Sequence, residues 1–286
     1  VWTGLSTLEH GIWHPTSFER LPEQRTLLPE LFADRGWNTF AVSPVQRMNP
    51  GYGYCRGFDR MVYSRRLQDA AVLAEFEAIE DVFQRSRRFV WLSLFSLHDQ
   101  LMHKRGSLKS LRHHVETDET SRASHVRSSY DPGLRKLYIE AVRDLDRNLM
   151  RLYQHCEALA ADQDVSVTLF SDHGQGYLGA SSHPLSHEKL HVPLVVQDFA
   201  GSRKEVATPV SIKEAYSISE RLSCGEDIRT LATSVAGPVF AETVYPGQEY
   251  RVAMGLGSGT RYYRGSVVNG RSIDPGLLAF EFSDTA

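Results

Sequence analysis

The sequence predicts an α/β protein: a three-layer sandwich of helices around a mostly parallel β-sheet, with a small β-rich part at the carboxyl end. Three observations predict this class. Apolar runs rich in β-branched and aromatic residues, at 89–95 and 165–170, alternate with amphipathic helical segments. The longest helical segment, 134–161, carries an apolar stripe at steps of three and four residues. From residue 250 onward, short β segments are separated by Gly-containing turns, which is typical of an antiparallel meander.

The remaining elements follow from the same patterns. Apolar residues recur at helical spacing over 25–35, and Gly36 is a suitable stop for that helix. The stretch 104–129 is strongly polar and predicts an exposed excursion. The other predicted elements are helices over 67–84 and 213–222 and strands over 39–43, 192–196 and 239–244. We expect an α/β domain over 1–245 and a β-rich segment over 246–286.

Composition and charge exclude only a few classes of function. The 286 residues are 41% hydrophobic and 23% charged, as in an ordinary globular protein. A formal net charge of −3 gives no indication of a nucleic-acid partner, and no apolar run reaches the length of a membrane span. Cys55, Cys156 and Cys224 are far apart and odd in number, so they predict ordinary thiols, as in the reducing cytoplasm.

The strongest candidate site follows the strand over 165–170. Ser171, Asp172, His173 and Gly174 come directly after it. The carboxyl end of a buried strand is where open α/β sheets place their ligands. A carboxylate oxygen and a neutral imidazole nitrogen together form half of a typical divalent-metal site. The alternative interpretation is an Asx-type turn, in which Asp and Gly serve only the backbone.

Further histidines cluster near strand ends. The strand over 89–95 is followed by Ser96, His98, Asp99 and His103, and the loop over 176–191 contains His183, His187, Glu188 and His191. We expect the strands over 89–95 and 165–170 to be near neighbours in one parallel sheet, joined by the long helix. Both histidine-bearing loops would then emerge at the same edge of the sheet, opposite Asp172.

The order of motifs resembles the sulfatase branch of the alkaline phosphatase superfamily. Thr3-Gly4 followed by His10-Gly11 resembles the segment that comes just after the nucleophile in those enzymes. TLLPELFADRGWNTFAVS, at 26–43, resembles their first helix and strand, and RGFDR, at 56–60, resembles their rGFD motif. The long helix before SDHG and the loop that leads into HVPLVV complete a similarity over roughly residues 1–245.

The resemblance implies roles for individual residues. Asp172 and His173 match the pair that binds the divalent metal, which would be calcium, zinc or manganese. His103 and His183 match histidines that contact the transferred group and are the candidate catalytic residues. His98, His187 and His191 are the alternatives to them. The interval between His98 and His103 also resembles the phosphoethanolamine transferase branch.

The function implied by the resemblance is metal-dependent hydrolysis of a sulfate or phosphate ester carried by a small molecule, a glycan or a lipid. A metal with imidazole donors suits this chemistry because the transition state spreads negative charge over oxygen atoms. Two alternatives stay open: a phosphoethanolamine-type transferase on the same scaffold, and a non-catalytic or fragmentary family member. The sequence also leaves open a membrane association and a homo-oligomer.

The sequence departs from the family pattern in two places. It contains no C-x-P-S-R motif, and the family's nucleophile precedes its TG segment, so we expect the nucleophile upstream of Val1 or from a partner chain. Within the sequence, Thr3 and Ser6 are the nearest hydroxyls. The Lys-x-x-His element of sulfatases is replaced by SPVQRMNPGYGY at 43–54, which favours a phosphate-ester branch or a divergent member. There Arg47 is either an anion-binding group or a solvated cation.

Overall fold

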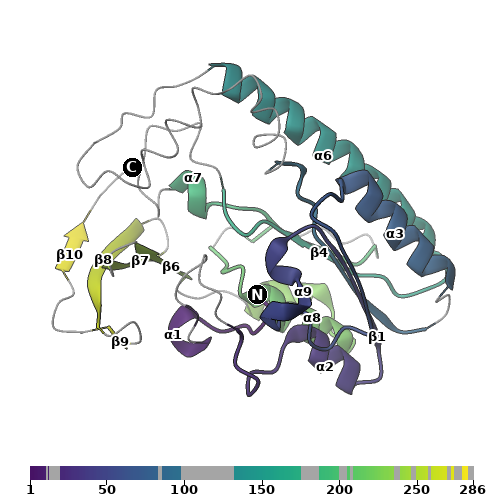
Figure 1. The fold of residues 1–286 in the computed structure, drawn as a ribbon, viewed down its shortest axis with the longest axis horizontal. Helices are drawn as coiled ribbons and strands as arrows, with labels where there is room; N and C mark the ends of the chain where they lie inside the picture. The colour runs from purple at the N-terminus through teal and green to yellow at the C-terminus, as the bar shows by residue number, and fades with distance from the viewer. Residues whose placement is uncertain are drawn as a thin grey trace.

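The computed structural model of the chain describes residues 1–10, 12, 20–82, 86–97, 132–174, 187–199, 205–206, 209–234, 239–245, 249–256, 259–268, 272–273 and 279–282. In Figure 1 a parallel sheet lies between two layers of helices. α3 (Asp69–Val82) and α6 (Pro132–Leu159) cover one face, and α2 (Leu28–Asp34) and α8 (Glu214–Ser223) cover the other, with α9 (Ile228–Ser234) beside α8. The predicted three-layer α/β class is confirmed.

The parallel sheet has the strand order β2-β1-β3, with β1 (Asn38–Ser43) in the centre between β2 (Arg60–Tyr63) and β3 (Arg88–Leu92). From Thr39 to Ser43 every residue of β1 is buried, because helices cover both faces of the sheet. Phe40 and Val42 face α3 and pack against Val72 and Ile79. This contact forms the apolar core on that face of the sheet.

Aromatic side chains fill the opposite face of the sheet. Phe32 of α2 stacks on Phe89 of β3, with ring centroids 4.3 Å apart. Near the start of the chain, the ring of Trp2 lies 4.1 Å from that of Trp91, also on β3. The first residues, which precede the short helix α1 (Thr7–His10), are therefore held against β3. Ring contacts of this kind stabilise the folded state by more than the burial of their apolar area alone.

The RGFDR motif stabilises the amino end of β1. Buried Thr39 donates its backbone N–H to Oδ2 of Asp59 (2.8 Å), and its hydroxyl donates to the carbonyl of Gly57 (2.6 Å). The Thr39 hydroxyl in turn accepts the N–H of Asp59 (2.9 Å). Every polar group of the Thr39 side chain is thus satisfied. We call Thr39, Gly57 and Asp59 the amino-end cluster.

Gly57 is required at its position for two reasons. Its φ of +82° is in the left-handed region, and a Cβ there would lie 2.2 Å from the backbone nitrogen of Glu30. The neighbouring Arg56 forms an ion pair with Glu30 (3.2 Å). The motif therefore fastens the loop before β2 to the start of α2, which gives this part of the family resemblance a structural explanation.

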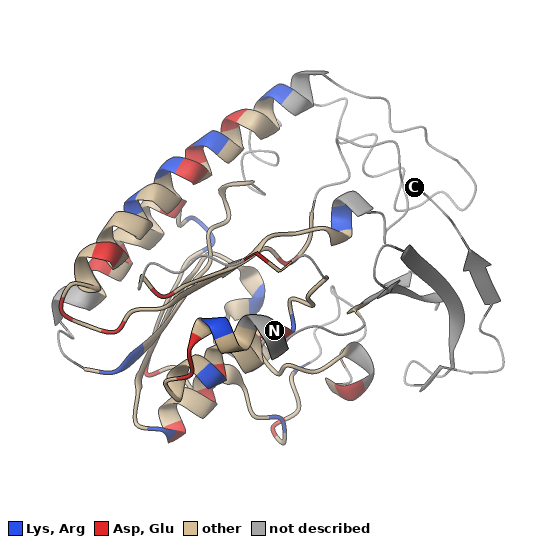
Figure 2. Cartoon of the chain, turned by 180° about the vertical axis from the view of Figure 1, so that it is seen from behind, with Lys and Arg blue, Asp and Glu red and all other residues tan. Residues whose placement is uncertain are grey.

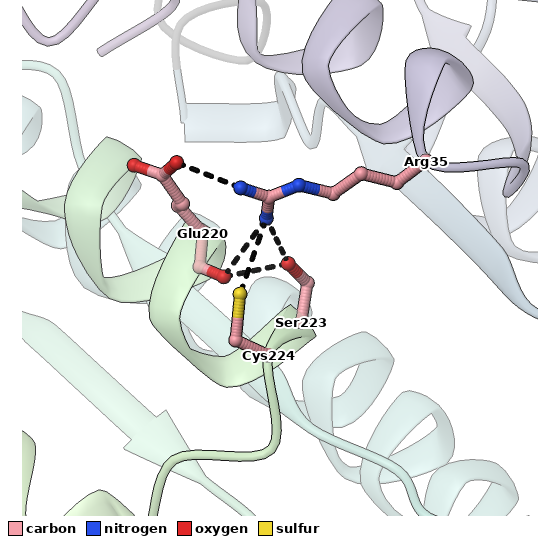
Figure 3. A network of polar contacts seen from close by, with 4 residues as sticks. All are labelled: Arg35, Glu220, Ser223 and Cys224. Atoms are coloured by element: carbon pink, nitrogen blue, oxygen red, sulfur yellow. Dashed lines mark hydrogen bonds and ion pairs between the residues drawn. The ribbon is translucent and has the colours of Figure 1, made fainter.

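α8 is attached to α2 through Arg35, the residue that follows α2 (Figure 3). Nη2 of Arg35 forms an ion pair with Glu220 (2.9 Å), and Nη1 donates to the hydroxyl of Ser223 (2.7 Å) and to Sγ of Cys224 (3.5 Å). One guanidinium thus connects three positions at the end of α8. The planar shape and several donors of the guanidinium make such multiple contacts possible.

The predicted long helix is confirmed as α6. It packs on α3 through a two-bond ion pair of Arg151 with Glu77 (2.8 and 2.5 Å) and through the rings of Phe76 and His155 (5.2 Å). Four of its large apolar side chains stay exposed: Ile139, Val142, Met150 and Tyr153. Acidic and basic residues alternate along its outer side (Figure 2). None of the helices formed by the described residues combines the length and apolar content needed to cross a bilayer.

The strand before SDHG differs from the prediction. β4 (Val167–Phe170) pairs in antiparallel direction with β5 (Leu194–Gln197), and among the described strands it is not hydrogen-bonded to β3. The two predicted neighbours do meet through side chains, since the rings of Trp91 and Phe170 lie 5.7 Å apart. The residues of β4 and β5 are half-buried, and Val195 is exposed, so these apolar strands are less covered than β1.

The carboxyl-terminal part is an antiparallel sheet, as the meander pattern predicts. Its order is β10-β8-β7-β6, with β9 paired to β8. The strands are β6 (Val239–Tyr245), β7 (Glu249–Leu256), β8 (Gly259–Val268), β9 (Ser272–Ile273) and β10 (Ala279–Phe282). The predicted division between residues 245 and 246 falls between β6 and β7, which pair along their length.

Candidate functional site

Asp172 and His173 lie in an exposed turn directly after β4. The turn is held by its own backbone: the N–H of Gly174 donates to the carbonyl of Lys189 (2.8 Å), which belongs to α7 (His187–Leu190). The hydroxyl of Ser171 donates to the carbonyl of His173 (2.9 Å). The N–H of His173 donates to Oδ1 of Asp172 (2.9 Å), so one carboxylate oxygen is bonded to the backbone of the next residue.

The surroundings of His173 fix which ring nitrogen carries the proton. Nδ1 lies 2.9 Å from the carbonyl oxygen of Gly174. A carbonyl oxygen only accepts hydrogen bonds, so Nδ1 must be the donor, and the neutral ring presents its lone pair at Nε2. This is the arrangement typical of a metal-binding histidine, whose second nitrogen donates to a backbone carbonyl or carboxylate.

The two side chains turn electron-rich atoms toward one another. Oδ2 of Asp172 and Nε2 of His173 are 3.7 Å apart, and the side chains are 83% and 59% exposed. A carboxylate oxygen and an imidazole lone pair at this separation are two donors that a single cation could accept. The turn is open to solvent, which makes these atoms accessible to a ligand.

A divalent ion fits this pair of donors. Oxygen and nitrogen ligands lie about 2.0 to 2.2 Å from zinc, so two donors to one ion are at most about 4.4 Å apart. The distance of 3.7 Å between Oδ2 and Nε2 falls within that limit. Within the part of the chain that the structure describes, no group of three or more potential ligands gathers. Asp172 and His173 stay predicted ligands, and as a pair they would supply only part of a coordination shell.

The other predicted site residues are placed only in part. His103 and His183 lie outside the described residues, as do His98 and Asp99, so their convergence on Asp172 stays a prediction. The backbone of α7 begins at His187, and the bond between Gly174 and Lys189 brings this helix against the turn. Exposed His191 follows directly after α7. Two of the alternative histidines thus belong to the segment beside Asp172.

The hydroxyls near the start of the chain have local structural roles. Both the hydroxyl and the N–H of Ser6 donate to Oε2 of Glu9 (2.8 and 2.7 Å) at the start of α1, and these bonds lower the pKa of Glu9. Oγ1 of Thr3 accepts the N–H of Leu5 (3.2 Å). The expectation of a nucleophile upstream of Val1 or from a partner chain stays a prediction. Arg47 is half-buried in the short 3₁₀ helix η1 (Gln46–Met48), ahead of η2 (Pro50–Tyr52).

Sequence reasoning missed a set of polar residues beneath the carboxyl ends of β1 and β3. Buried Ser43 donates its hydroxyl to that of Ser93 (2.9 Å), and Nε1 of Trp91 donates to the same oxygen (3.1 Å). The N–H of Ser93 donates to the carbonyl of Val42 (3.0 Å). We call Ser43, Trp91 and Ser93 the carboxyl-edge cluster. The signal was present in the sequence, because Ser43 ends one apolar run and Ser93 interrupts the other.

The fold and the turn after β4 define a class: an α/β protein with a carboxylate and an imidazole presented together after a strand of its core. A comparison with protein families defines the class more narrowly. A family model described as sulfatase matches residues 1–220, and the chain belongs to the sulfatase family. This confirms the resemblance that the order of motifs indicated.

One solved structure shares the fold at low sequence identity. The lipoteichoic acid synthase LtaP from Listeria monocytogenes is 13% identical, with a TM-score of 0.52, and the similarity covers 91% of this chain and 69% of that one. The protein Ps i-CgsB is also 13% identical, with a TM-score of 0.49, over 94% of this chain and 72% of that one. No curated protein matches the chain.

Proposed function

We propose that this protein is a divalent-metal-dependent enzyme that hydrolyses phosphate or sulfate esters, and that Asp172 and His173 bind its metal. The observation that carries the proposal is the approach of Oδ2 and Nε2 to 3.7 Å while Nδ1 is occupied by a carbonyl. Membership of the sulfatase family supports the same assignment. The metal is calcium, zinc or manganese, since all three accept a carboxylate and the last two suit imidazole well.

The residues around the turn prepare this site. A bound divalent ion supplies positive charge that stabilises the negative charge developing on ester oxygens. The carbonyl of Gly174 holds the imidazole of His173 in one tautomer and one orientation. The backbone bond to Lys189 holds the turn itself, so the donors are preorganised. We assign His103 and His183 the contacts with the transferred group and the protonation of the leaving oxygen.

A transferase is the second candidate. One feature favours it: after β1 the chain passes through Arg47 into two short 3₁₀ helices, η1 and η2, and this segment lacks the Lys-x-x-His element of sulfatases. A transferase would pass the phospho-substituent to an alcohol rather than to water. Turnover of a 4-nitrophenyl phosphodiester with and without a glycerol acceptor distinguishes the two. If the main product is the phosphate ester of glycerol, the enzyme is a transferase. If the main product is the phosphate monoester left after transfer to water, the enzyme is a hydrolase.

Metal binding tests the shared part of the proposal. Titration calorimetry with Mn²⁺, Zn²⁺ and Ca²⁺ should detect a site in the wild-type protein, and Asp172→Ala should weaken it by about tenfold or more, because a charged ligand is lost. Asp162→Ala, which removes an exposed carboxylate from the turn after α6, is the matched control and should bind like the wild type. Equal affinity in wild type and Asp172→Ala would remove Asp172 from the metal site.

A further inference from the structure

A second carboxylate lies beneath the carboxyl end of β3. Asp69 is the first residue of α3 and is only 3% exposed. Its Oδ1 accepts two backbone N–H groups, those of Phe95 (2.8 Å) and Ser96 (3.2 Å). Both residues belong to the chain that has just left β3. Asp69 therefore connects α3 to the segment that follows the strand.

The surroundings of Asp69 suit a charged carboxylate. Hydrogen bonds from backbone N–H groups to an ionised oxygen are stronger than bonds between neutral partners. The amino end of α3 places partial positive charge next to it. The hydrogen bonds and the helix amino end offset the free-energy cost of removing a carboxylate from water. Losing the carboxylate would release two buried donors together.

One side of this arrangement is left unsatisfied. Oδ2 of Asp69 and Oγ of Ser96 are both buried, and neither has a hydrogen-bond partner among the residues that the structure describes. An unpaired buried polar atom costs free energy. Such local costs concentrate at functional sites, where geometry matters more than stability.

The segment after β3 is held from a second direction as well. Ser93 is bonded to Ser43 and to Val42 of β1, while Phe95 and Ser96 are bonded to Asp69 of α3. The chain is thus fixed over residues 93–96 by two different elements.

This anchored segment lies at the proposed site. Trp91, near the end of β3, contacts Phe170, the last residue of β4, with ring centroids 5.7 Å apart. The carboxyl ends of β3 and β4 are therefore adjacent. The chain that leaves β3 past Ser96 starts at the edge where the Asp172–His173 turn follows β4.

We propose that Asp69 is a positioning residue for this site. Its carboxylate sets the direction in which the chain leaves β3 at Phe95 and Ser96, at the edge where the Asp172–His173 turn follows β4, and the candidate catalytic residue His103 follows later in the sequence. The inference rests on the proposed function, because it assigns Asp69 a role in that reaction. It predicts a loss of turnover without a loss of metal binding, since Asp69 touches neither donor.

The test compares Asp69→Ala and Asp69→Asn with Asp59→Ala, the matched loss of a carboxylate at the amino end of β1. For Asp69→Ala we expect hydrogen exchange at the amides of Phe95 and Ser96 to accelerate about 10-fold or more, and kcat on a 4-nitrophenyl ester to fall about 10- to 100-fold. KM and the Kd for Mn²⁺ should change little. Asp69→Asn keeps an acceptor and should restore most of kcat. Asp59→Ala should lower Tm with kcat per folded molecule unchanged.

The outcomes separate the two proposals. A wild-type protein that neither binds metal nor turns over esters contradicts the proposed function, and the role of Asp69 falls with it. A wild-type protein that turns over while folded Asp69→Ala keeps full kcat contradicts the role of Asp69 alone. If Asp69→Ala does not fold, Asp69→Glu decides, because it keeps the charge and displaces it by one methylene. Reduced kcat with unchanged Kd in that variant supports the role, and unchanged kcat overturns it.

Discussion

The two ends of the parallel sheet satisfy their polar groups in different ways. At the amino end, Asp59 reaches in from the surface and, with Gly57, satisfies every polar group of buried Thr39. At the carboxyl end, Asp69 uses one oxygen and leaves the other unpaired within the described residues, and the nearby turn after β4 exposes Asp172. The polar groups at the amino end of the sheet are thus satisfied by hydrogen bonds. The unsatisfied carboxylate oxygen lies at the carboxyl end, which is where α/β proteins bind ligands.

A substitution at Gly57 should disrupt the packing at the amino end of the sheet more than any other change considered. Gly57→Ala should destabilise the protein by about 4 kcal/mol, because the new Cβ collides with the backbone of Glu30 and φ is +82°. Urea denaturation measures the difference. Gly36→Ala is the control, since its φ of +76° is similar but nothing lies within 4 Å of its Cβ position. It should cost only about 1 kcal/mol, and equal effects at both glycines would contradict the collision.

Removing one carboxylate from each end compares the two ends directly. Asp59→Ala should cost about 2 kcal/mol, because the buried N–H of Thr39 loses its charged acceptor. Asp172→Ala should change the free energy of unfolding by no more than about 0.5 kcal/mol, as expected for an exposed side chain. Chemical denaturation without metal tests both. The comparison fails if Asp172→Ala is the more destabilising of the two.

The guanidinium of Arg35 joins α2 to α8 in the helix layer on one face of the sheet. Arg35→Ala should destabilise by about 1 kcal/mol, since the ion pair with Glu220 and the other hydrogen bonds of the guanidinium are partly exposed to solvent. A double-mutant cycle with Glu220→Ala should give a coupling energy of about 0.5 to 1 kcal/mol. Zero coupling would show that the contact in Figure 3 does not stabilise the α2–α8 interface.

Ser6 provides the smallest effect. Ser6→Ala should cost less than about 1 kcal/mol at neutral pH and leave turnover unchanged, because its hydroxyl bonds Glu9 at a helix start. The Ser6 bonds lower the pKa of Glu9 below its ordinary value of 4.5 in the folded state, so their stabilisation is present above pH 4.5 and is lost as pH falls. The difference from wild type should therefore shrink in acid. Abolished turnover would instead make Ser6 the nucleophile.

The sequence predicted those features that depend on neighbouring residues. The apolar stripe of α6 and the run at β1 are local patterns, so both elements were found, and Asp172 and His173 are adjacent in the chain. Strand partners are not local: nothing in the residues 167–170 indicates that β4 pairs in antiparallel direction with β5. Asp69 was missed for the same reason, because its partner Phe95 is 26 residues away and a polar residue at a helix start is unremarkable.

The strand order β2-β1-β3 has a consequence for how the chain folds. All three strands and α3 lie within residues 38–92, so the parallel sheet and its first helix form from one continuous stretch. Because a growing chain leaves the ribosome from its amino end, this stretch is complete before α6 is synthesised. The pairing of Asn38 with Arg88 closes a loop of moderate length, which keeps the entropic cost of assembly low. The sheet can therefore form first, and α6 and then β4 can pack against it as they are synthesised.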